Sequence, residues 1–94
     1  MTLKWHENSE NESCLRLYDG NTERKVCVIR CVDGHYFLDG SANKTVWYNH
    51  LINANTMEEA KVEVKKIFAN NLTESLQECL NKTKIYSEML AALA

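Results

Sequence analysis

Residues 26–38 read Val-Cys-Val-Ile-Arg-Cys-Val-Asp-Gly-His-Tyr-Phe-Leu, and this stretch decides the fold. Two runs of β-branched and aromatic residues flank Asp33-Gly34, a dipeptide typical of a β-hairpin closed by a type I′ turn. Such a turn fixes the register, so we expect Ile29 opposite Leu38 and Arg30 opposite Phe37. Side chains alternate along a strand, and one face is therefore uncharged and predicted to form the core: Cys27, Ile29, Cys31, Tyr36 and Leu38. The opposite face is mixed: Val28, Arg30, Val32, His35 and Phe37.

Upstream of the hairpin, residues 13–18 alternate between apolar and polar and predict a half-buried strand. If Tyr18 faces Arg24 across the following turn, Leu15 lies opposite Cys27 on the core face. Further upstream, Leu3 and Trp5 indicate a short edge strand, and the acidic, Asn-rich residues 7–12 are typical of a solvated loop.

Downstream of the hairpin, residues 39–44 predict a break, and residues 45–52 are rich in strand formers and predict a fourth strand. No helical pattern separates these segments. We therefore expect an antiparallel meander of three to four strands.

A capping box then opens a helix, because the Thr56 hydroxyl is placed to accept from the Glu59 backbone while the Glu59 carboxylate reaches back. An apolar stripe at helical spacing predicts that this helix lies across the sheet: Met57, Ala60, Val64, Ile67 and Phe68. Past Asn70-Asn71 the apolar phase slips by one residue, which predicts a break near 70–71, either a kink or a helical hairpin. A heptad-like stripe follows: Leu72, Leu76, Cys79, Thr83, Tyr86, Leu90 and Leu93.

The predicted fold class is thus α+β, a strand meander followed by two C-terminal helices. Its 94 residues form a single domain, with a β-sheet region at 1–52 and a helical region at 56–94. Eleven basic against thirteen acidic residues give a net charge of −2, which disfavours nucleic acid as a partner. No segment is apolar for long enough to span a membrane and the start of the chain is too polar for a signal peptide, so we expect a cytoplasmic protein.

Chemical motifs are scarce in this sequence. Cys27, Cys31 and His35 suggest a zinc site, but residues four apart in a strand are separated by about 13 Å, too far for shared ligation. No phosphate-binding loop, serine elbow or metalloprotease pattern occurs. We therefore expect no catalysis, no metal and no cofactor.

The candidate protein interface combines an arginine and aromatic residues with surplus apolar residues, a composition typical of interface hot spots. Ile85 and Met89 broaden the apolar side of the last helix. This indicates either a helix with more than one packing partner or a small protein whose end carries scattered exposed apolar residues, as ordinary surfaces do. Trp47 or Tyr48 is expected to join the sheet part. The predicted interface residues are Val28, Arg30, Val32, His35, Phe37, Tyr86, Met89, Leu90 and Leu93.

The succession of Trp5, a strand ending at Tyr18-Asp19-Gly20, the hairpin, and a helix opened by Thr56-Met57-Glu58-Glu59-Ala60-Lys61 resembles small phage and prophage proteins over residues 5–69. The resemblance implies a βββα-type sheet with a helix packed across it. It also implies a mobile-element accessory protein, a group that includes anti-CRISPR inhibitors. It carries over no functional residue.

These observations predict a small non-catalytic protein-binding module, specifically a mobile-element inhibitor of a host defence complex. Two alternatives stay open. In the first, the stripe from Leu72 to Leu93 pairs between two chains, and the homodimer is a structural or regulatory unit. In the second, the protein is a nucleic-acid-binding regulator.

Overall fold

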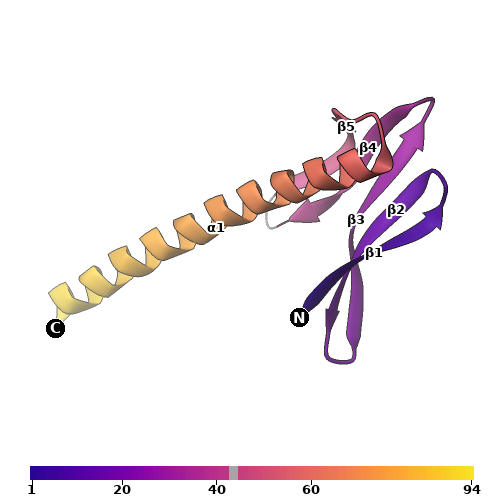
Figure 1. Cartoon of the computed structure of the whole chain (residues 1–94). Helices are drawn as coiled ribbons and strands as arrows, with labels where there is room; N and C mark the ends of the chain where they lie inside the picture. The colour runs from indigo at the N-terminus through magenta and orange to yellow at the C-terminus, as the bar shows by residue number, and fades with distance from the viewer. Residues whose placement is uncertain (43–44) are drawn as a thin grey trace.

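The computed structural model describes residues 1–42 and 45–94, and it is an α+β fold of one antiparallel sheet and one long helix (Figure 1). The sheet has five strands in sequence order, β1-β2-β3-β4-β5. The meander is confirmed, although it has five strands where three to four were expected and a single helix where two were expected. The elements are β1 (Thr2–Ser9), β2 (Glu12–Asp19), β3 (Thr22–Val32), β4 (His35–Ala42), β5 (Thr45–Ile52) and α1 (Met57–Leu93).

The central hairpin has the predicted register, with Ile29 paired to Leu38 and Arg30 to Phe37. Asp33 and Gly34 both have positive φ, 52° and 76°, as a type I′ turn requires. Ile29 and Leu38 are completely buried, and Cys27 is buried beside them. The other two residues predicted for the core face, Cys31 and Tyr36, are only half-buried.

The β2–β3 hairpin reaches the predicted pairing of Leu15 with Cys27 by a different route. The expected pairing of Tyr18 with Arg24 is wrong, because Tyr18 pairs with Glu23. The register shifts by one residue between Leu15 and Arg16, and this β-bulge leaves Val26 without a direct partner. Because a bulge adds one residue to one strand, it restores the core-facing register that the tighter turn would otherwise displace.

Two strands are longer than predicted. The solvated loop expected at residues 7–12 is wrong, since β1 continues to Ser9 and only a two-residue turn precedes β2. The break expected at residues 39–44 is also wrong for its first part, because β4 continues to Ala42, with Gly40 paired to Cys27. Residues 43 and 44, the rest of that expected break, lie outside the described residues.

The capping box opens α1 as predicted, with one change. The Glu59 backbone N–H donates to Thr56 Oγ1 at 3.1 Å, whereas the Glu59 carboxylate accepts from the backbone of Asn55 (2.8 Å), one residue before the cap. The predicted stripe faces the sheet, where Ala60, Val64 and Phe68 are buried and Met57 and Ile67 pack beside them.

The helix break predicted near residues 70–71 is wrong, because α1 is continuous over 37 residues. Asn71 caps no second helix; its side-chain amide donates to Thr45 Oγ1 of β5 at 2.8 Å. The apolar phase slips because the two parts of α1 have different surroundings. Up to Asn71 the helix packs on β3, β4 and β5, and beyond it the helix projects past the sheet (Figure 1).

This projection gives the molecule an elongated shape, with principal extents of 61 × 32 × 18 Å. At a rise of 1.5 Å per residue, α1 alone is about 55 Å long. Among the described residues, no helix is both long and apolar enough to cross a membrane.

Gly40→Ala tests the tight contact between β3 and β4. A Cβ at position 40 would lie 2.6 Å from the Cys27 Cβ, so the strands must shift to accept it. Overpacking of this kind costs about 1–3 kcal/mol of unfolding free energy, which urea denaturation measures. Ser41→Ala on the exposed side of the same strand is the matched control, and equal stability of the two variants would contradict the contact.

Candidate protein-interaction surface

The distal segment of α1, residues 72–93, carries large apolar side chains that remain in solvent. All of its residues except the half-buried Ser75 are exposed. The predicted interface residues of the helix lie here: Tyr86, Met89, Leu90 and Leu93. Together with Leu72, Leu76, Leu80 and Ile85, these side chains are between 52% and 80% exposed. Ordinary surfaces seldom concentrate so many large apolar groups in one segment, which makes this segment the candidate interaction surface of the chain.

The apolar residues of the distal segment follow alternating spacings of four and three, the spacing of a coiled-coil seam. We call Leu72, Leu76, Cys79, Thr83, Tyr86, Leu90 and Leu93 the seam. Thr83, its most polar member, donates its hydroxyl to the Cys79 carbonyl at 2.8 Å, so it adds no unpaired polar group to an apolar contact. Only Lys82 is charged among the positions that flank the seam: Thr73, Ser75, Leu80, Lys82, Ser87 and Met89.

A groove of about 710 Å³ lies between the sheet and α1, where the helix leaves the sheet. Its apolar lining comes from both sides: Leu3, Leu15 and Leu17 of the sheet, and Val64, Phe68 and Leu72 of the helix. Its basic lining consists of Arg24, Lys25 and Lys65. Sequence reasoning missed this groove, although the spacing of Val64, Phe68, Leu72 and Leu76 places the groove and the seam on one side of α1.

The sheet residues of the predicted interface lie on the opposite face from α1, and the structure does not bring them next to the helix residues. Val32 and His35 are exposed, whereas Val28, Arg30 and Phe37 are half-buried. Tyr48, 81% exposed, joins this outer face. Trp47 does not join it, because its ring packs on Phe68 of α1 with centroids 4.9 Å apart.

Arg30, the expected centre of the outer face, is held by neighbours of its own chain. Its Nε donates to Asp39 Oδ2 at 2.7 Å, and its Nη2 donates to the Asn49 side chain. Asn49 has a φ of 49°, and its backbone N–H donates to Asp39 Oδ1 at 2.8 Å. Burial disfavours the charged Asp39, but the Asn49 and Arg30 bonds outweigh burial and lower the pKa of this carboxyl. Arg30 therefore stabilises the bulge between β4 and β5.

The described residues contain free thiols and one small His–Tyr cluster, but no group of metal ligands. The four cysteines are free, and burial raises the pKa of Cys27 to about 12, so its thiol stays protonated. No group of three or more His, Cys, Asp or Glu suited to a metal occurs in the described part of the chain. An exposed cluster joins His6 to the Tyr18 hydroxyl and Glu23 to Arg16, but burial and Glu23 raise the pKa of Tyr18 away from neutrality.

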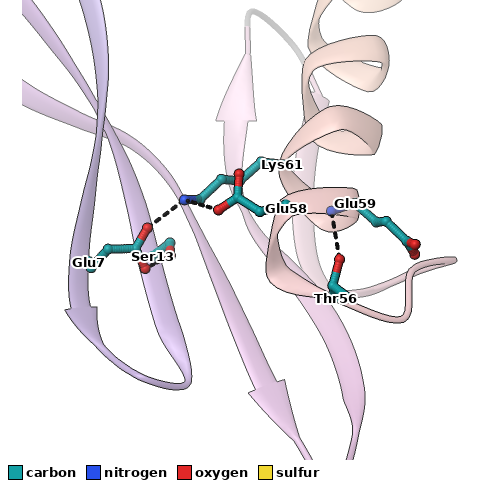
Figure 2. A network of polar contacts seen from close by, with 6 residues as sticks. All are labelled: Glu7, Ser13, Thr56, Glu58, Glu59 and Lys61. Carbon is teal, nitrogen blue, oxygen red and sulfur yellow. Dashed lines mark hydrogen bonds and ion pairs between the residues drawn. The ribbon is translucent and has the colours of Figure 1, made fainter.

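A polar junction fastens β1 to α1 beside the N-cap (Figure 2). Lys61 Nζ lies 2.5 Å from Glu7 Oε1 and 3.2 Å from Glu58 Oε1, and it sits 5.7 Å from the Trp5 ring centre. Ser13 donates to the second Glu7 oxygen at 2.6 Å. The Lys61 bond, followed by the Ser13 bond, lowers the pKa of Glu7 below its ordinary value of 4.5.

The Glu7–Lys61 pair should give the protein a defined acid dependence. A carboxyl with a lowered folded-state pKa adds stability above its unfolded pKa, and that stability is lost as the pH falls through the folded value, here below 4.5. Glu7→Gln should therefore lower the unfolding free energy at pH 7 by about 0.2–1 kcal/mol, the range of exposed ion pairs. Denaturation across pH 3–7 measures the difference, which should vanish at the acid end. A pH-independent difference would contradict the pairing.

Comparisons of the chain with protein-family models, with curated proteins and with solved structures gave no significant match. What can be inferred about function therefore comes from the geometry of this chain, and its most unusual feature is the exposed seam beside the groove.

Proposed function

We propose that the protein is a non-catalytic interaction module whose contact element is the distal segment of α1, and that this segment forms a coiled coil with a second copy of the chain. The observation that carries the proposal is the seam itself, an uninterrupted run of four-three spacings on a solvent-exposed helix. Such spacing forms a self-complementary surface, because each side chain fits between four of the facing helix.

The energetics favour a partner for this segment. Helices owe most of their stability to packing of an apolar face, and the distal segment has little packing within its own chain. Fully burying a leucine is worth about 1.5–3 kcal/mol, so leaving several in water forgoes a large stabilisation. A second copy meets little repulsion, since Lys82 alone is charged beside the seam.

The finer proposal, inhibition of a host defence complex, is supported by the resemblance to phage proteins and by no particular contact of this chain. The nucleic-acid alternative has weaker support. The distal segment carries Glu74, Glu78 and Glu88 against Lys82 and Lys84, which is not the basic stripe that binds phosphates.

Leu76→Glu tests the proposed pairing. Two copies of the change, each removing at least about 1.5 kcal/mol of burial, should weaken the dimer on the order of a hundredfold. Light scattering after size exclusion should show a dimer for the wild type at tens of micromolar and a monomer for the variant. Circular dichroism should show reduced helicity in the variant.

Asn81→Glu adds the same charge on the side of α1 opposite the seam and serves as the matched control, which should stay dimeric. A wild-type protein that is monomeric at tens of micromolar would overturn the proposed self-association. Equal effects of the two substitutions would show that the added charge, rather than the seam, controls assembly.

A further inference from the structure

We propose that the two helices of the dimer run antiparallel, and that the C-terminal end of each α1 enters the groove between the sheet and α1 of the other copy. This inference rests on the proposed function and names the occupant of the groove. The juxtaposition that carries it is an apolar groove at one end of the seam and an apolar helix end at the other.

The end of α1 needs cover on more than one side. Residues 89–94 read Met-Leu-Ala-Ala-Leu-Ala and contain no polar side chain, and Met89, Leu90 and Leu93 are all more than half exposed. A helix that is apolar all round is normally buried, whereas a two-stranded coiled coil covers only one side of each helix. The groove offers two walls, one from the sheet and one from the helix.

The heptad register brings that end to the groove. In an antiparallel pair, Leu72 layers with Leu90 of the second copy, Leu76 with its Tyr86 and Cys79 with its Thr83. One further layer places Leu93 of the second copy beside Ala69, which lines the groove together with Phe68. From Leu72 to Leu93 each helix spans about 32 Å, so the seam and the groove are filled together.

A parallel pair fits the same surfaces poorly. It would bring both sheets to the same end of the dimer. The part of the second α1 nearest each groove would then be the part that is already packed on its own sheet. The apolar ends would then meet only each other. The antiparallel pair keeps the sheets at opposite ends and presents the apolar residues 89–93 of each α1 to the groove of the other copy.

The charges of the two surfaces agree with this arrangement. A helix C-terminus carries a partial negative charge, and α1 has no basic residue in its last turn to offset it. The groove of the other copy is lined by Arg24, Lys25 and Lys65, whose positive charge offsets this partial negative charge.

The exposed Cys79 allows a direct test of direction. In a parallel dimer the two Cys79 side chains share a layer and mild oxidation links them. In the antiparallel register each Cys79 faces Thr83 of the other copy. The two Cys79 residues are then displaced from each other by about 6 Å along the axis, which is beyond disulfide geometry. Chains that retain Cys79 are oxidised in two experiments, once alone and once in a mixture with chains that carry both Cys79→Ser and Thr83→Cys. The mixture should give several-fold more covalent dimer than either chain alone.

A second pair of chains tests the groove. Ala69→Cys and Leu93→Cys, each combined with Cys79→Ser, should cross-link only when mixed. Cys79→Ser alone is the control for the half-buried Cys31 and should give no covalent dimer. All substituted positions are exposed, and circular dichroism verifies that each chain is folded.

The outcomes separate the two proposals. A monomeric wild type overturns the proposed function and this inference together. A dimer whose Cys79 chains cross-link alone is parallel and overturns only the inference. A dimer linked between positions 79 and 83 but not between 69 and 93 is antiparallel, with its ends outside the grooves, and overturns the groove assignment.

Discussion

The structure depends on the packing of the first three turns of α1 against the central hairpin. Ala60 and Val64 are completely buried over Ile29 and Leu38, which are themselves fully excluded from solvent. This core is small because α1 touches the sheet with only its first part. The groove and the exposed seam follow from where that contact ends.

The parts of the fold that sequence reasoning predicted are those that local chemistry decides. Asp33-Gly34 specifies a turn with positive φ at both positions, and with it the register of four residue pairs. Thr56 specifies the start of the helix, because its hydroxyl satisfies a backbone N–H that would otherwise lack a partner.

The parts that it missed depend on contacts distant in sequence. Asn70 and Asn71 each cost less than about 1 kcal/mol inside a helix, and the bond from Asn71 to Thr45 helps to hold the helix there. The alternation of apolar and polar residues in the sequence does not reveal the bulge at Val26. For the candidate site, the exposed helix residues were predicted, but Arg30 proved to be occupied by Asp39, and the groove arises only when Leu17 and Leu72 come together in space.

Because α1 has no break at Asn70 and Asn71, it is one rigid rod that is held where its first part packs on the sheet. Phe68, the last buried residue of the helix, lies about 37 Å from Leu93 along the axis, so a tilt of a few degrees at the core moves the far tip by several ångströms. The small side chain of Ala60 determines how closely α1 approaches the sheet. The direction in which the distal segment points is therefore set by core residues such as Ala60, which lies outside the seam.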